Sequence, residues 1–250
     1  MRIMTTRFLA FVLFACASCT WAASATQERQ RLYSQANLLA IGALTYYDTD
    51  PRAATLPDAG LLETLSESRL TLKHLAETLP LPTSVETPLA GMDASLDQLG
   101  RLSREQATGY APLLISLLGN RAQFSQQLDA AFTEQPASPL AAALNRQSRR
   151  ISEILLHALA RNAVVLREHS TAHYESGLGP QDQAIEQGFD ELKALLPATA
   201  AKQFRQQRLA YRFVRPWLLR SDPLQRIAAS QRYIIAIVAW LDQQAIQAEH

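Results

Sequence analysis

Residues 28–47 read ERQRLYSQANLLAIGALTYY, and this stretch decides the fold class. Its opening turn carries Arg29 and Arg31. Apolar residues then recur at three- and four-residue steps, namely Leu32, Ala36, Leu39, Ala43 and Tyr46. Such spacing places side chains on one face of an α-helix, because a helix turns once in about 3.6 residues. The stretch therefore predicts an amphipathic helix with a cationic first turn.

The composition extends this prediction to the whole chain. Of 250 residues, 48% are hydrophobic and 19% are charged, which is typical of a folded protein with one or two domains. Leu, Ala, Gln, Arg and Glu dominate, and β-branched residues are sparse. Because the common residues are good helix formers, we predict an all-α protein.

The run Arg31-Leu32-Tyr33-Ser34-Gln35 resembles the first-helix motif of the PilJ-type and nitrate-sensor-type periplasmic sensing domains. Those domains are helical bundles that receive a small signal outside the inner membrane. The resemblance implies a periplasmic sensory or ligand-binding module in which Arg31 matches the motif arginine that contacts an anion.

The first 25 residues have the pattern of a secretory signal peptide. Arg2 and Arg7 precede an apolar run over residues 8–17, and small residues follow, with cleavage expected after Ala22 or Ala25. We therefore expect an exported, periplasmic protein.

Both cysteines, Cys16 and Cys19, lie inside this segment, so a cleaved chain has no thiol for a disulfide or a nucleophile. Acylation of a cysteine is an alternative, because residues 13–16 have some features of a lipobox, although Phe14 fits poorly. An uncleaved single-span anchor is a second alternative.

About eight amphipathic helices are expected after residue 25. Beyond the first, apolar periodicity predicts helices over about 58–79, 89–106, 110–132, 140–173, 185–196, 204–218 and 224–241, with loops at 85–88 and 177–180. The strongest boundary is Thr133–Pro139. We predict two halves, 26–135 and 136–250, as tandem up-down four-helix bundles or one extended bundle.

The second half repeats the first in outline. When the halves are aligned, Arg149-Arg150-Ile151-Ser152-Glu153 falls opposite Arg31-Leu32-Tyr33-Ser34-Gln35, with Arg150 where Leu32 stands. An internal duplication and a coincidence between low-complexity helices both explain this pattern.

A duplication would bring Arg31 and Arg149 together at a pseudo-two-fold axis, where they could share one small anion. Guanidinium groups near helix starts suit this task, because each can donate two parallel hydrogen bonds to an oxyanion. We therefore select Arg31, Ser34, Arg149 and Ser152 as candidate ligand-binding residues. The alternative is that these arginines are solvated or salt-bridged on helix surfaces.

No catalytic or metal-binding motif is found in the sequence. Gly-x-Ser-x-Gly, phosphate-binding glycine loops and His-Glu-x-x-His are lacking. His169 and His173 are four residues apart, but two imidazoles lack the three or four ligands of a zinc site. We expect a non-enzymatic protein without a metal or cofactor.

Residues 202–232 carry eight basic residues and one acidic residue, interleaved with aromatic residues. Export argues against nucleic acid as the partner. An anionic membrane, a cell-wall acid or an acidic protein would fit such a face, and a solvated bundle face is the alternative. Two functions follow: a sensory module that acts through an envelope or signalling partner, or a structural or adaptor protein of the cell envelope that uses the basic face.

Overall fold

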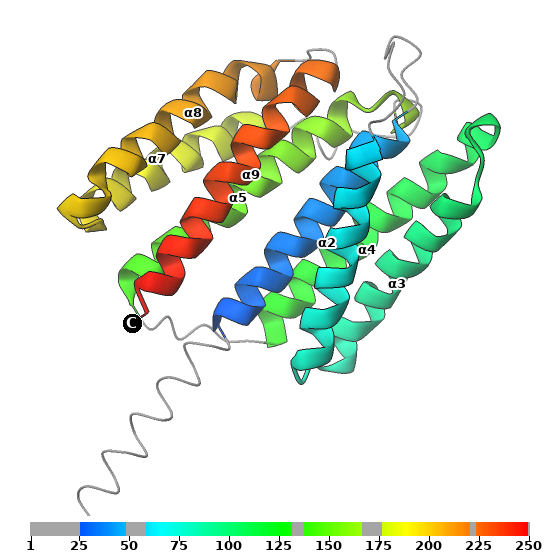
Figure 1. Ribbon diagram of the computed structural model, residues 1–250, viewed down its shortest axis with the longest axis horizontal. Helices are drawn as coiled ribbons and strands as arrows, with labels where there is room; N and C mark the ends of the chain where they lie inside the picture. The colour runs from blue at the N-terminus through cyan, green and yellow to red at the C-terminus, as the bar shows by residue number, and fades with distance from the viewer. Residues whose placement is uncertain (1–25, 49–58, 132–137, 167–176, 221–223, 250) are drawn as a thin grey trace, which may run out of the picture.

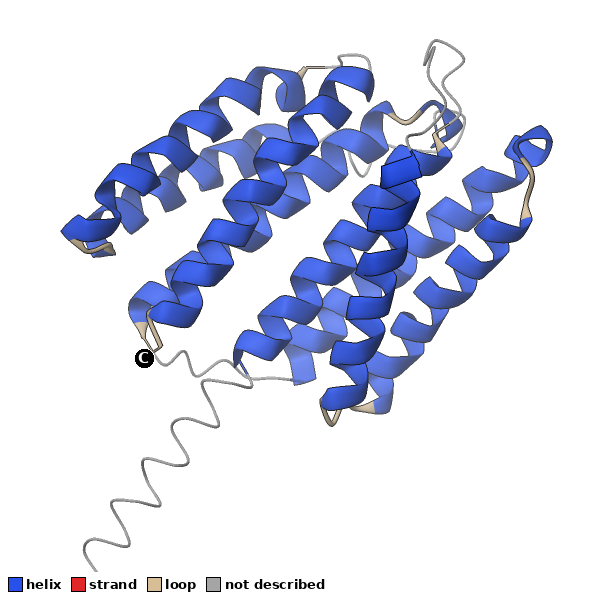
Figure 2. Ribbon diagram, in the orientation of Figure 1, coloured by secondary structure: helices blue, strands red, loops and turns tan. Residues whose placement is uncertain are grey.

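The computed structural model describes residues 26–48, 59–131, 138–166, 177–220 and 224–249. These residues form eight α-helices and no strand (Figures 1 and 2). The α-helices are the first helix (residues 26–47), α2 (Ala59–Thr78), α3 (Thr83–Arg101), α4 (Tyr110–Ala131), α5 (Pro139–Asn162), α7 (Leu178–Leu195), α8 (Ala201–Leu219) and α9 (Leu224–Gln247). The all-α prediction is confirmed.

The helices fall into two groups in the order of the chain. In the second group, α5 packs against α7 and α9, and α8 packs against α9 and α7. In the first group, α3 packs along α4. Helix α2 lies close to the first helix at Gly42, because a Cβ atom at that position would be 3.2 Å from Leu65 Cδ1 of α2. Figure 1 shows the first helix between the two groups, with α9 on one side and α2 on the other.

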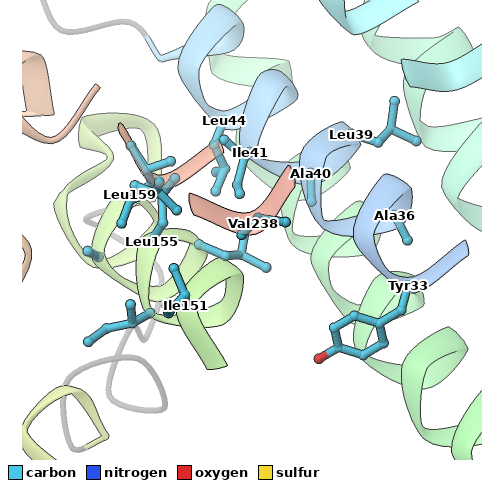
Figure 3. Packing of buried hydrophobic residues seen from close by; sticks show 14 of the residues in the cluster. Tyr33, Ala36, Leu39, Ala40, Ile41, Leu44, Ile151, Leu155, Leu159 and Val238 are labelled. Atoms are coloured by element: carbon cyan, nitrogen blue, oxygen red, sulfur yellow. The ribbon is translucent and has the colours of Figure 1, made fainter. Parts of the chain in front are cut away.

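This central position explains why the first helix is buried on more than one face. Leu39 and Ala36 point to one side of it, whereas Ile41 and Leu44 point toward Val238 of α9 (Figure 3). All five side chains are buried. The sequence predicted a single apolar stripe, but a helix packed between two bundles buries a second stripe as well.

Helix α5 begins where the sequence provides a start signal. The Ser138 hydroxyl accepts a hydrogen bond from the Ala141 amide at 3.0 Å, and Pro139 occupies the first helical position, which needs no amide hydrogen. The helix ends at Asn162, so the prediction of one helix to residue 173 is wrong. A tertiary contact stabilises this end, because Asp48 Oδ1 accepts a hydrogen bond from the Val164 amide at 2.9 Å.

Two predicted loops also prove to be helical. Helix α3 begins at Thr83 and includes Pro88, which costs one backbone hydrogen bond, but Val85 and Pro88 are both buried. Helix α7 begins at Leu178, with Pro180 in its first turn, where amide groups lack intrahelical partners in any case. Burial in the first case and position in the second outweigh the helix-breaking tendency of proline.

Three sequence predictions concern residues outside the described ranges. These are the signal peptide with Cys16 and Cys19, the boundary at 133–137, and the pair His169 and His173. Within the described residues, no helix combines the length and apolar character that a bilayer crossing requires. Export and independent folding of the two halves stay predictions.

Candidate functional site

A band of buried and half-buried polar side chains lies where the first helix meets α4, α5 and α9, and we call it the polar seam. Its members are Gln30, Tyr33, Ser34 and Asn37 of the first helix, Arg121 of α4, Arg149, Ser152 and Glu153 of α5, and Asp242 of α9. Asn37 is fully buried and Arg121 is only 5% exposed. Buried polar groups need hydrogen-bond partners, so the seam must be paired internally.

Arg121 is the centre of the inner part of the seam. Its Nε donates to Asn37 Oδ1 at 2.5 Å, and its Nη2 lies 3.3 Å from both the Tyr33 hydroxyl and Glu153 Oε1. Asn37 in turn donates from Nδ2 to Ser152 Oγ at 2.7 Å. One guanidinium thus holds α4 to the first helix and to α5.

The Tyr33 side chain separates this inner part from the outer part. Its hydroxyl donates to Glu153, and its ring lies under two guanidinium groups, with the Cζ of Arg149 at 4.7 Å and that of Arg121 at 5.4 Å from the ring centroid. Burial raises the pKa of Tyr33 above its usual value, and Arg121 opposes this rise. Tyr33 therefore stays neutral and acts as a donor.

The outer part joins Arg149, through Gln30, to the half-buried carboxyl group of Asp242. Arg149 donates from Nε to Gln30 Oε1 at 2.8 Å and from Nη1 to Asp129 Oδ1 at 2.7 Å. Gln30 and Ser34 donate to the two oxygens of Asp242 at 3.2 and 2.9 Å. Burial raises the pKa of Asp242, whereas hydrogen-bond donors and Arg149 lower it. A carboxyl group in this position titrates closer to neutral pH than an exposed one.

The contacts across the seam show that the first helix and α5 run parallel. Gln30 bonds Arg149, Tyr33 bonds Glu153 and, at the far end, Asp48 bonds Val164, so the residue numbers rise together. Two duplicated halves that pack about a two-fold axis parallel to these helices would also give parallel helices. The duplication itself stays a prediction.

The structure brings three of the four candidate ligand residues together. Ser34, Arg149 and Ser152 all belong to the seam, and the two serines are buried. Arg31 is 51% exposed and pairs with Glu28 of its own turn at 3.1 Å. Arg31 and Arg149 thus have different hydrogen-bond partners, and the second arginine beside Tyr33 is Arg121.

The sequence analysis missed Arg121, Asn37 and Asp242. For Arg121, the sequence did contain a sign of burial. Arg121 lies in register with Leu114, Leu117, Leu118 and Phe124, the buried stripe of α4. A charged residue inside an apolar stripe indicates a buried partner. The identity of that partner required the tertiary structure.

Three arginines of the predicted basic face are paired with carboxylates of α7. Arg208 and Arg212 both bond Glu186, at 2.8 and 3.0 Å. Arg215 bonds the two oxygens of the buried Asp182, from Nη2 at 2.5 Å and from Nε at 2.7 Å. We call this set the α7–α8 ladder. The Arg212 guanidinium, with Arg208, lowers the pKa of Glu186 to about 2.

A pocket of about 370 Å³ lies apart from the seam, between α2 and α3. Leu39, Leu72 and Met92 are buried apolar residues of its lining, while Lys73 and Glu77 are exposed at its rim. Such a lining suits the apolar part of a small molecule or side chain.

Among the residues that the structure describes, no group of three or more potential metal-ligating side chains is close enough to hold a metal ion. Comparison of the chain with protein-family models, curated proteins and solved structures finds no match.

Proposed function

We propose that the protein is a non-enzymatic sensory module of the periplasm that binds a small oxyanion at Arg149 and acts through a partner protein. The observation that carries this proposal is the position of Arg149 at the outer end of the polar seam. The Arg149 side chain is only 15% exposed, yet its Nη1 pairs with Asp129, whose side chain is 53% exposed. A free oxyanion can take the place of an exposed carboxylate on a partly buried guanidinium.

Binding at this position would be transmitted through contacts that already exist. Arg149 bonds Gln30, and Gln30 bonds Asp242, so one guanidinium links α5, the first helix and α9. An anion that withdraws Arg149 from Gln30 would change the docking of these three helices. Such a change in packing is what a partner protein would detect.

The proposal is tested by thermal shift and calorimetry with nitrate, nitrite, sulfate and small carboxylates. We expect one of these anions to stabilise the wild type, to act more strongly on Asp129→Asn, which removes the competing carboxylate, and to lose its effect in Arg149→Ala. Arg146→Ala is the matched control, since Arg146 lies on the same helix and pairs with Glu191 at the surface.

Arg31→Ala distinguishes two versions of the site. Loss of the effect in both Arg31→Ala and Arg149→Ala would support the shared site that the resemblance implies. Loss in Arg149→Ala alone would support a site centred on Arg149. If no anion affects either the wild type or Asp129→Asn, the sensory proposal fails and the envelope adaptor is the better description.

A further inference from the structure

Helix α8 presents a second face that its internal contacts leave exposed. Its inner face buries Phe204, Tyr211, Val214 and Leu218, and its side toward α7 forms the ladder. On the outer face, the side chains of Leu209 and Phe213 are 64% and 55% exposed. These are large values for apolar side chains, and the two residues are one helical turn apart.

Half-buried aromatic side chains extend this surface onto α9. The Phe213 ring packs edge-on against Trp217 at 5.0 Å and against Tyr233 at 5.5 Å. The Arg232 guanidinium lies over the Tyr233 ring at 4.9 Å. Leu209, Phe213, Trp217 and Tyr233 thus form one patch, which we call the aromatic patch. Continuous exposed patches of this kind commonly mark interaction sites.

Basic residues stand at both ends of the aromatic patch. Lys202 and Arg205 precede it on α8, and Arg220 follows it. Helix α8 has five basic residues and no acidic one, so every carboxylate in the ladder comes from α7. In the described part of the chain, no carboxylate pairs with Lys202, Arg205 or Arg220. The ladder neutralises one side of α8 and leaves the other side cationic.

We propose that the aromatic patch and these three basic residues dock the protein on the surface of a bilayer that contains anionic phospholipid. Charge complementarity requires an anionic occupant. Three of the four patch residues belong to α8, which lies at the outer edge of the fold, beside α7 and at the opposite end from α3 (Figure 1). Aromatic and aliphatic side chains enter the headgroup region of a bilayer, while flanking Lys and Arg reach the phosphates.

The test is co-sedimentation with two kinds of vesicle. It uses the protein in the form in which it is purified from the cells that produce it. One contains phosphatidylcholine and phosphatidylglycerol, and the other contains phosphatidylcholine alone. We expect binding to the first, weakening as salt rises, with a blue shift of tryptophan fluorescence as Trp217 leaves water. Phe213→Ser and Arg205→Glu should each weaken this binding by about tenfold.

Leu70→Ser is the matched control, because Leu70 is 68% exposed but lies on α2. It should bind vesicles as the wild type does, and melting curves should show that all three variants fold. Equal binding to both kinds of vesicle, or wild-type binding by both patch variants, would overturn the proposal. Absence of vesicle binding would also overturn it, and would favour an acidic protein as the partner of this face.

Discussion

The polar seam and the α7–α8 ladder are both built from arginines and carboxylates, but their surroundings differ. In the seam, Arg121 is 5% exposed and shares its donors among Asn37, Tyr33 and Glu153. In the ladder, Arg212 has a side chain that is 51% exposed and bonds one carboxylate, Glu186. We therefore expect the two arginines to stabilise the fold by different amounts, because water competes for the exposed Arg212 and is excluded from the buried Arg121.

The largest effect is expected at the centre of the seam. In Arg121→Ala, Asn37 Oδ1 loses the hydrogen bond that it accepts from Arg121, and Glu153 loses its ion pair. The substitution should therefore lower the free energy of unfolding by ~3–5 kcal/mol. Chemical denaturation followed by circular dichroism measures this change. A loss below ~1 kcal/mol would mean that the seam is no more stabilising than a surface ion pair.

The next effect is expected at the buried end of the ladder. Asp182 is 4% exposed and accepts hydrogen bonds from the Tyr211 hydroxyl at 2.9 Å and from Arg215. Asp182→Ala leaves the buried hydroxyl unpaired and should cost ~1–3 kcal/mol in the same assay. Tyr211→Phe keeps the Arg215 contact and serves as the control, with an expected cost of ~0.5–1.5 kcal/mol. An equal cost for both would contradict this assignment.

Acidification should also change the stability contributions of the two regions in opposite directions. The pKa of Glu186 is about 2 in the folded protein, below its ordinary value of 4.5, so its contribution to stability is present above pH 4.5 and is lost as the pH falls toward 2. The pKa of Asp242 is raised above 3.8, so its contribution is present at low pH and is lost as the pH rises through the folded value.

Melting temperatures measured across this pH range test both signs. Glu186→Gln should show a shallower loss of stability on acidification than the wild type. Asp242→Asn should gain stability relative to the wild type as the pH rises, because the variant buries no charge. Parallel curves for the wild type and both variants would contradict the assignment of the pH dependence to these two groups.

The smallest effect is expected at an exposed pair outside both regions. Arg146 and Glu191 have side chains that are 47% and 45% exposed and lie 2.6 Å apart. Arg146→Ala should change the free energy of unfolding by less than ~1 kcal/mol, and added salt should reduce even that. A change as large as that of Arg121→Ala would show that burial does not explain the difference between the two regions.

Local sequence signals predicted the helices and several of their ends. The bounds of α4 agree with the predicted range 110–132, and α5 begins at Pro139, one residue before the predicted start, because apolar periodicity acts within a few turns. Predictions failed where a distant residue decides the outcome. Helix α5 ends at Asn162 beside Asp48, which is more than a hundred residues away in the chain. Helix α3 includes Pro88 because its apolar side chain is buried.

The sequence by itself determined an all-α protein with an amphipathic first helix and selected Ser34, Arg149 and Ser152, three residues that lie in the seam. Only the tertiary structure decided that Arg121, rather than Arg31, lies with Arg149 beside Tyr33. The physical reason is the range of the interactions. Helix formation depends on neighbours three or four residues apart, whereas the burial and partners of a charged side chain depend on which helices meet.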